Sequence, residues 1–230
     1  MIARLSLDHH AFPDPLGADA SGLVAVGGDD HPERVWAAYI RGIFPWTGPG
    51  QPRLWWSPDP RFVLRTDRIT PPRSLVKRMR QRPFAISFDT AFDAVLQHCA
   101  TAARPGQRGT WLTTGLMRSM SALHEQGLAH SVEAWQGETL VGGLYGLQVN
   151  GVFCGESMFA LAADASKVAF VTLVAHLRSW GVALVDCQVR TDHLARFGAE
   201  DWPRERFLQA LAAAAPSTVP TGRWGVDPRI

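Results

Sequence analysis

Cysteine is scarce in this chain of 230 residues, and the three that occur are far apart. Cys99, Cys154 and Cys187 form no CxxC pair, which excludes a disulfide framework and favours reduced thiols in a reducing compartment. The chain also lacks any apolar run of the ~18 residues that a membrane-spanning helix needs. Its N-terminus, MIARLSLDHHAF, has no apolar segment typical of a signal peptide, so we expect the protein to be cytoplasmic.

Metal-ligand spacing is absent among the eight histidines. His124 and His130, for example, are six positions apart, which does not place them on one face of a helix, so we expect no metal site. A large excess of one charge is absent too, because 23 Lys and Arg stand against 21 Asp and Glu. A net charge of +2 does not by itself demand a nucleic-acid partner, so the distribution of charge matters more.

Positive charge gathers between residues 61 and 82. Only Asp67 opposes the basic residues of this segment, which are Arg61, Arg65, Arg68, Arg73, Lys77, Arg78, Arg80 and Arg82. Arg73, Lys77 and Arg80 share one face if the segment is helical. A solvated helix face and a patch that contacts phosphates both fit this pattern.

Residues 1–62 are predicted to form a small, loop-rich domain that holds four of the nine tryptophans. In RLWWSPDPR (53–61) two prolines follow a pair of tryptophans. Because proline removes a backbone donor and restricts the residue before it, this stretch favours a stiff loop over an inner strand. A helix is predicted to begin near Pro32, with Asp30 as its cap, and to end near Gly42.

Residues 63–230 carry mixed helix and strand signals and are predicted to form a second domain. Strands are expected at 84–88, 129–135, 138–149, 151–159 and 182–189, with Asn150-Gly151 as a hairpin turn. Helices are expected at 89–100, 112–127, 164–181, 191–198 and 203–215. This order predicts an α+β fold whose larger, mixed α/β domain is of the acetyltransferase (GNAT) type.

Asp186 stands inside the apolar strand VALVDCQV (182–189), where a carboxylate is costly unless it has a partner or a task. Gln188 lies two residues further on, so regular alternation predicts both side chains on one sheet face. The pair fits two interpretations: acid–base and orienting chemistry on an amine, or a buried pair that caps backbone groups. Arg190 is a candidate ion-pair partner for Asp186.

Glu156 in FCGESMF (153–159) would form an acidic pocket if it meets Asp186, and such a pocket favours a cationic substrate. Four apolar residues are candidates for a neighbouring pocket, although they also fit a plain core: Met158, Phe170, Leu173 and Val185. Trp111 fits either a core position or stacking on a base. The loop before the helix at 164–181, ALAADASK, contains no glycine, which argues against a pyrophosphate site for acyl-CoA.

The chain resembles the leucyl/phenylalanyl-tRNA–protein transferases over nearly its whole length. The motifs that carry the resemblance, in order, are GLVAVGGD (22–29), AYIRGIFPW (38–46), LWWSPDPR (54–61), TW (110–111), LHEQGLAHSVEAW (123–135), LVGGLYG (140–146), FCGESMF (153–159), ASK (165–167) and DCQV (186–189). The resemblance implies transfer of leucine or phenylalanine from tRNA to proteins that begin with arginine or lysine. It also implies an N-degron product, read by a ClpS–ClpAP route. Because the aminoacyl ester is already activated, it implies no cofactor.

The resemblance assigns roles to positions of this sequence. Asp186 and Gln188 match the catalytic pair, Glu156 a contact for the basic acceptor residue, and Met158 the aminoacyl pocket. Trp46 and Trp111 match platforms for the terminal adenosine. Trp55 and Trp56 are then expected to shape the wall of a cleft between the domains, and the tRNA phosphates to lie on the basic segment, with Arg73, Lys77, Arg78, Arg80 and Arg82 as contacts.

Two pairs depart from the family pattern: Asp30-His31, where Leu-Ser is usual, and Ser119-Met120, where Ala-Tyr is usual.

Three other functions remain open on the sequence alone. They are an acyl-CoA-dependent N-acyltransferase, an RNA-binding module without catalysis, and an aminoacyl-tRNA transferase that acts on an amino sugar or a lipid-linked peptide.

Overall fold

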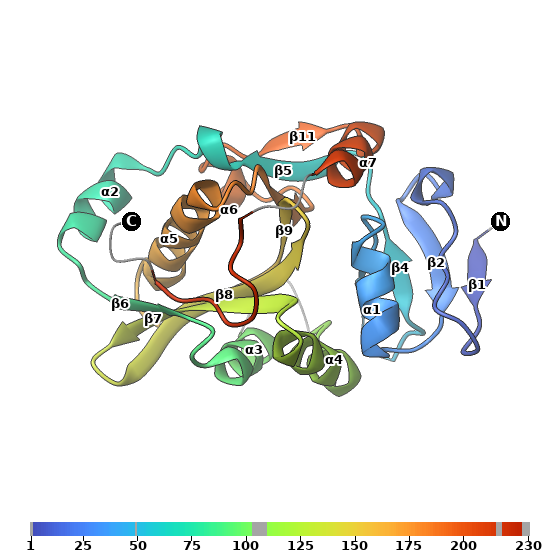
Figure 1. The fold of residues 1–230 in the computed structure, drawn as a ribbon, viewed down its shortest axis with the longest axis horizontal. Helices are drawn as coiled ribbons and strands as arrows, with labels where there is room; N and C mark the ends of the chain where they lie inside the picture. The colour runs from blue at the N-terminus through green and yellow to red at the C-terminus, as the bar shows by residue number, and fades with distance from the viewer. Residues whose placement is uncertain (1, 49, 103–109, 215–217, 227–230) are drawn as a thin grey trace.

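Two sheets of unequal size divide the molecule in the computed structural model (Figure 1). The structure describes residues 2–48, 50–102, 110–214 and 218–226. A small sheet belongs to the N-terminal part and a large mixed sheet with flanking helices to the rest, which confirms the predicted α+β class. The helix predicted over 203–215 begins as expected, but residue 215 lies outside the described residues.

The small sheet has four strands in the order β1-β2-β4-β3. Their bounds are Ala3–Leu5, Leu23–Gly27, Phe44–Pro45 and Leu54–Trp56 for β1 to β4, and a 3-10 turn, η1, spans Pro15–Gly17. The prediction that the tryptophan pair lies in a loop is wrong, because β4 is an inner strand paired with both β2 and β3. The prolines follow the strand and so leave its ladder intact.

Helix α1, Pro32–Tyr39, packs between the small sheet and the rest of the molecule (Figure 1). Its predicted cap was Asp30, but the cap is His31, whose Nδ1 accepts from the Glu33 N–H at 3.4 Å. Asp30 is thereby released for contacts outside the helix.

The large sheet has seven strands in the order β11-β5-β10-β9-β8-β7-β6. Its strands are β5 Arg61–Arg65, β6 Ala85–Phe88, β7 Ala129–Gln136, β8 Thr139–Val149, β9 Val152–Ala160, β10 Leu184–Gln188 and β11 Glu200–Trp202. Neighbours run antiparallel except β9 and β10, which are parallel and are connected through a helix. The proposed domain boundary between residues 62 and 63 falls within β5.

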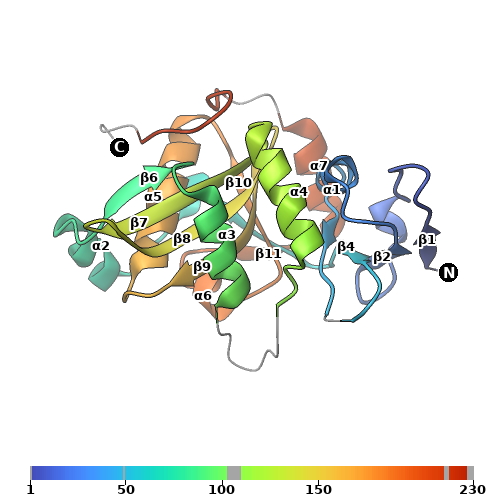
Figure 2. The same cartoon turned by 90° about the horizontal axis from the view of Figure 1, so that it is seen from below.

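Helices cover both faces of the large sheet. They are α2 Arg73–Arg80, α3 Phe92–Thr101, α4 Thr114–Glu125, α5 Ala165–Ser179, α6 Asp192–Ala195 and α7 Arg204–Ala213, with a 3-10 turn, η2, at Thr66–Arg68. Helix α5 lies on one face and α3 and α4 on the other (Figure 2). Helix α5 can approach β8 because Gly142 lacks a side chain, whose Cβ would lie 2.5 Å from that of Ala165. None of the described helices is long and apolar enough to cross a membrane.

An opening between β9 and β10 creates space for a site. The two strands pair as far as Cys154 and Asp186, but β9 continues to Ala160 without further pairing to β10. A register shift between β8 and β9 lies next to this point, at Tyr145 and Gly146. A Cβ on Gly146 would sit 2.3 Å from the Cys154 carbonyl oxygen, so the close strand approach there requires glycine.

Candidate active site

A cavity of about 340 Å³ lies where β9 and β10 part, and both domains line it. The structure brings together in this cavity every residue that the sequence suggested for catalysis or substrate binding: Trp46, Trp111, Glu156, Met158, Phe170, Leu173, Val185, Asp186 and Gln188. Their convergence from five segments of the chain makes this cavity the candidate active site.

One side of the cavity is apolar. Met158 enters from β9, Phe170 and Leu173 from α5, and Val185 from β10. Three further apolar residues that the sequence did not single out complete this side: Leu144, Phe153 and Leu194. This side fits an aliphatic or aromatic group of limited size.

The two predicted platforms also line the cavity. Trp46, from the small domain, is 44% exposed, whereas Trp111, from the large domain, is 8% exposed. Trp56 donates its indole N–H to the Trp46 carbonyl at 2.7 Å and packs edge-on against the ring. Neither Trp55 nor Trp56 lines the cavity directly. Trp55 is a fully buried residue of the core that both domains share, and Trp56 supports the cavity only through its contact with Trp46.

Asp186 is fully buried and ion-paired. Both of its carboxylate oxygens accept from Arg61, Oδ1 from Nε at 2.7 Å and Oδ2 from Nη2 at 2.6 Å. The expected partner, Arg190, instead donates to Asp201 at 2.8 Å on the surface. The sequence could not identify Arg61, because β5 and β10 are far apart in the chain and meet only in the sheet.

Arg61 belongs to the basic segment 61–82 by sequence, but its side chain is buried and does not contribute to a charged surface. It is 1% exposed, donates Nη1 to the Gly42 carbonyl at 3.1 Å, and lies between the rings of Phe44 and Phe207. Burial acts to lower the pKa of the guanidinium, but the Asp186 carboxylate outweighs burial and the pKa of Arg61 is raised. The guanidinium therefore stays charged and holds Asp186 in place.

Regular strand alternation was predicted to place Gln188 on the same sheet face as Asp186. Gln188 instead reaches the cavity through a break in that alternation. The register of β10 against β5 shifts between Asp186 and Gln188, and Gln188 has a φ of 62°, in the left-handed region. Its backbone N–H donates to Asp186 Oδ1 at 2.9 Å, and its side-chain Nε2 donates to Glu156 Oε1 at 2.5 Å. A local turn, held by the two carboxyl groups, orients this amide.

Glu156 sits in an environment that disfavours its charge. Burial raises the pKa of Glu156 to about 8, opposed by hydrogen bonding from the Tyr39 hydroxyl and the Gln188 amide and assisted by the nearby charge of Asp186. Its Oε2 is enclosed and has no hydrogen bond of normal geometry among the described residues. Asp186 and Glu156 thus form the expected acidic corner, but their charges are supported unequally.

The two thiols beside this corner are poor nucleophiles. Burial raises the pKa of both Cys154 and Cys187, and the charge of Asp186 raises each further. Because the thiolate is the reactive form, neither thiol is suited to covalent catalysis. Among the described residues, all three cysteines are buried and none forms a disulfide bond.

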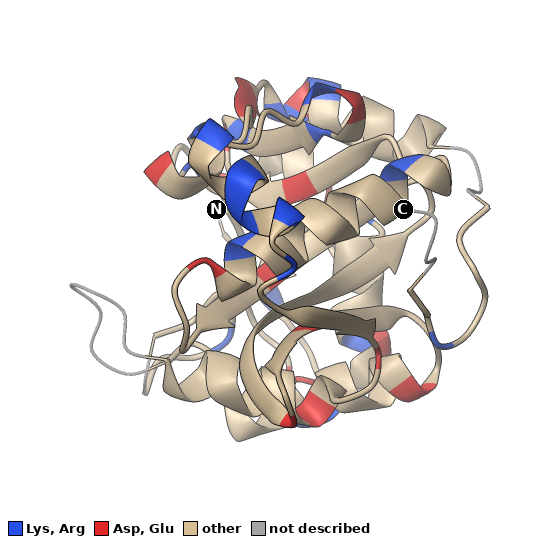
Figure 3. Cartoon of the chain, turned by 90° about the vertical axis from the view of Figure 1, so that its left-hand side faces the viewer, with Lys and Arg blue, Asp and Glu red and all other residues tan. Residues whose placement is uncertain are grey.

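The basic residues of α2, and Arg82 just after the helix, lie on the surface. Arg73, Lys77, Arg78, Arg80 and Arg82 are all exposed, and Leu75 is the buried residue of the helix. Figure 3, which faces the α2 side of the molecule, shows Lys and Arg gathered there. Their contact with tRNA stays a prediction.

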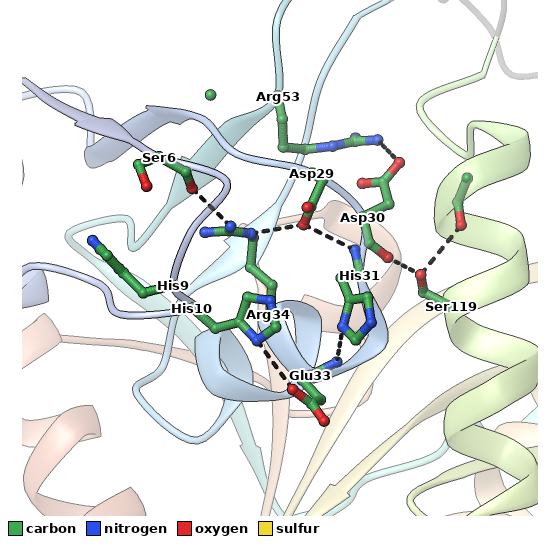
Figure 4. Close-up of polar contacts among 12 residues, drawn as sticks. Ser6, His9, His10, Asp29, Asp30, His31, Glu33, Arg34, Arg53 and Ser119 are labelled. Atoms are coloured by element: carbon green, nitrogen blue, oxygen red, sulfur yellow. Dashed lines mark hydrogen bonds and ion pairs between the residues drawn. The ribbon is translucent and has the colours of Figure 1, made fainter.

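Three potential metal ligands meet outside the cavity, although the histidine spacing did not indicate them. His10, His31 and Glu33 place one donor atom each within 4.8 Å of the others (Figure 4). Each of them has a protein partner: His10 Nδ1 lies 3.3 Å from Glu33 Oε2, and His31 caps α1. A cation there would face the positive end of the helix, which disfavours a metal.

Two family models match this chain. The model described as leucyl/phenylalanyl-tRNA protein transferase matches residues 63–212. The model described as the N-terminal domain of that transferase matches residues 28–59.

Individual proteins give the same result. The leucyl/phenylalanyl-tRNA–protein transferase of Myxococcus xanthus (strain DK1622) is 56% identical over 224 residues, which cover 97% of this chain and 96% of the relative. That of Anaeromyxobacter dehalogenans (strain 2CP-C) is 54% identical over 217 residues, covering 94% and 93%. Among solved structures, a GCN5-related N-acetyltransferase from Kribbella flavida has a TM-score of 0.33 and 13% identity, covering 72% of this chain and 59% of its own.

Proposed function

This chain belongs to the leucyl/phenylalanyl-tRNA–protein transferase family, and from that premise we propose that it transfers leucine or phenylalanine to proteins that begin with arginine or lysine. It is an aminoacyltransferase that moves an amino acid from aminoacyl-tRNA to a protein. The observation that carries the finer proposal is the cavity itself, which joins an apolar side, an acidic corner and two tryptophans.

The apolar side receives the side chain of the transferred amino acid. Met158, Phe170, Leu173 and Val185 offer contact to leucine or phenylalanine without a hydrogen-bonding group. Selectivity among apolar residues is modest in such a pocket, because one methylene is worth about 1–3 kcal/mol. Two different apolar side chains are therefore compatible with one site.

The acidic corner receives the acceptor N-terminus. Gln188 presents its amide oxygen to the α-ammonium while its Nε2 stays on Glu156, and the Asp186–Arg61 pair holds Gln188 through its backbone N–H. The α-amine loses its proton readily, since its ordinary pKa is about 7.7–8.0. The proposed catalysis is therefore mainly positioning, with modest acid–base help. Glu156 binds the basic side chain of the acceptor in its ionised form, which a nearby cation favours.

The donor tRNA is held at two places. Trp46 and Trp111 stack on the terminal adenosine, a contact worth ~1–3 kcal/mol per base. The exposed cations of α2 contact phosphates, which carry much of the affinity for nucleic acid. Because the donor ester is already activated, the transfer needs no cofactor or metal. The product carries an N-terminal leucine or phenylalanine, which a ClpS–ClpAP-type route in the cytoplasm would read as an N-degron.

The test is transfer of labelled phenylalanine from Phe-tRNA to peptides that differ only in their first residue, Arg, Lys or Ala. Wild type should label the Arg and Lys peptides and not the Ala peptide, and Asp186→Ala should lose this transfer. Arg190→Ala is the matched control, because Arg190 forms an exposed ion pair with Asp201 and does not itself line the cavity.

Each alternative function has its own signature in this assay. Labelling of an amino sugar or a lipid-linked peptide instead of the Arg peptide would show that the donor is aminoacyl-tRNA but that the acceptor is not a protein N-terminus. Binding of Phe-tRNA without transfer to any acceptor would indicate an RNA-binding module. Transfer from an acyl-CoA would move the protein to the acyl-CoA-dependent class.

A further inference from the structure

Trp46 and Trp111 come from different domains, so their spacing depends on a contact between those domains. Three polar side chains make such a contact close to both tryptophans: Asp30 and Arg53 from the small domain and Thr113 from the large one (Figure 4 shows Asp30 and Arg53). We call these three residues the Asp30 bridge.

The Asp30 bridge is a closed triangle of hydrogen bonds. Arg53 Nη2 donates to Asp30 Oδ2 at 2.5 Å and to Thr113 Oγ1 at 2.9 Å, and the Thr113 hydroxyl donates to the same Asp30 oxygen at 3.1 Å. The side chains of Arg53 and Asp30 are 8% and 17% exposed, so solvent screens them little. Ser119 on α4 adds a hydrogen bond to the Asp30 carbonyl.

Backbone hydrogen bonds connect the bridge to each tryptophan. On one side, the Thr113 N–H donates to the Trp111 carbonyl at 3.1 Å. On the other, the Trp46 N–H donates to the carbonyl of Leu54, the residue after Arg53, at 3.1 Å. Hydrogen bonds, together with the peptide link between Arg53 and Leu54, therefore connect Trp111 with Trp46.

A glycine in α4 leaves the space that the Asp30 carboxylate occupies next to this helix. Gly115 lies in the first turn of the helix, where glycine is a poor helix former. A Cβ at this position would lie 2.6 Å from Asp30 Oδ2, so a larger residue would push the carboxylate away from Thr113.

Stability alone does not explain the bridge. Buried ion pairs contribute little net stability because desolvation offsets their attraction. Here Asp30 Oδ1 and Arg53 Nη1 are also enclosed with no hydrogen-bond partner among the described residues, which adds to the cost. The remaining physical effect of the bridge is to fix one geometry between the two domains.

We propose that Asp30, through Arg53 and Thr113, is a positioning residue that sets the spacing of Trp46 and Trp111 for the terminal adenosine of tRNA. This inference rests on the stacking role proposed above for the two tryptophans. It goes further by assigning the spacing of the platforms to a polar contact outside the cavity.

The test compares Asp30→Ala with Asp29→Ala, both measured below the unfolding temperature of either variant. Asp29 accepts from the buried Arg34 within the small domain, so its loss also weakens that domain but leaves the bridge intact. Asp30→Ala should raise KM for Phe-tRNA about tenfold, because stacking depends on ring position. Its kcat, its KM for the Arg peptide and the ratio of leucine to phenylalanine transfer should stay near wild type. Asp30→Asn, which keeps an acceptor for Arg53, should fall between.

Two results would overturn the proposal. A KM for Phe-tRNA that is equal in Asp30→Ala and Asp29→Ala would reduce the bridge to a structural contact. Trp46→Ala separates this failure from failure of the stacking role: a raised KM there beside an unchanged KM in Asp30→Ala overturns only the positioning. An unchanged KM in Trp46→Ala overturns the stacking and the positioning together.

Discussion

At the scale of single residues, Asp186 and Glu156 share one cavity but receive opposite electrostatic support. Arg61 donates to both oxygens of Asp186, which stabilises that carboxylate as an ion. Burial raises the pKa of Glu156 to about 8, so that carboxyl is largely protonated at neutral pH. Two carboxyl groups that lie in such different environments are suited to different chemical roles. Asp186 is held in a buried ion pair with Arg61, whereas Glu156 changes its charge near physiological pH.

This difference predicts an effect of pH on stability. The pKa of Glu156 is higher in the folded chain, about 8, than its ordinary value of 4.5, so the folded state binds the proton more tightly. The contribution of Glu156 to the free energy of unfolding therefore falls as pH rises from 4.5 to 8, by at most about 1.4 kcal/mol per pH unit. Glu156→Gln removes this loss and should raise Tm relative to wild type at pH 8 but not at pH 4.5.

Thermal unfolding at several pH values checks this prediction. The matched control is Glu138→Gln, at an exposed turn position, which should leave the pH dependence of Tm as in wild type. A Tm difference between Glu156→Gln and wild type that does not change with pH would contradict the raised pKa.

At the scale of elements, α2 contributes charge more than packing. It buries Leu75 and exposes Arg73, Lys77 and Arg80 along one face, as the sequence predicted. Three of its cations lie in the last turn, where they interact favourably with the helix dipole. The segment of α2 contains no acidic residue, so its exposed face carries only positive charge.

Charge reversal on α2 tests the proposed phosphate contacts. The triple variant Arg73→Glu, Lys77→Glu, Arg80→Glu should raise KM for Phe-tRNA at low salt with little change in kcat. The salt dependence of binding should flatten by about 0.7–0.9 in log–log slope for each lost phosphate contact. Reversal of the exposed Arg178 on α5 is the control. An unchanged KM in the triple variant would remove α2 from the tRNA site.

At the scale of the whole molecule, the two sheets share one apolar core. Buried residues of the small domain, such as Val35 and Trp55, belong to the same cluster as Leu116 and Met120 of α4 and Phe207 of α7. Arg61 adds a polar tie through the Gly42 carbonyl. The chain therefore has two separate sheets, but we expect the two domains to fold together because they share this core.

A fragment of residues 60–230 is expected to fold poorly by itself. It keeps the large sheet but exposes the apolar surface that the small domain covers, and it loses Phe44 and Trp46 from the cavity. It should bind a hydrophobic dye, unfold at a lower temperature than the full chain and transfer no amino acid. Cooperative unfolding at the Tm of the full chain would show instead that the large domain is independent.

Much of the architecture followed from local patterns in the sequence. The Asn150-Gly151 hairpin, the helix that became α5 and the strand that became β10 all formed close to where the patterns predicted them. Strand β4 did not follow from the local pattern, because the prolines after Trp56 disfavour a strand locally, whereas pairing with β2 and β3 stabilises one. Pairing depends on strands remote in sequence, which local propensity does not register.

By itself the sequence determined the α+β class, the family and the set of side chains available to the cavity, because periodicity, turn residues and long motifs are local properties of the chain. Only the tertiary structure decided that Arg61 pairs with Asp186, that a turn brings Gln188 to Glu156, and that Asp30 meets Thr113. The physical reason is that these contacts join residues far apart in the chain or depend on a break in strand regularity. Burial then sets the charge of each group, and burial exists only once the sheet and helices have packed together.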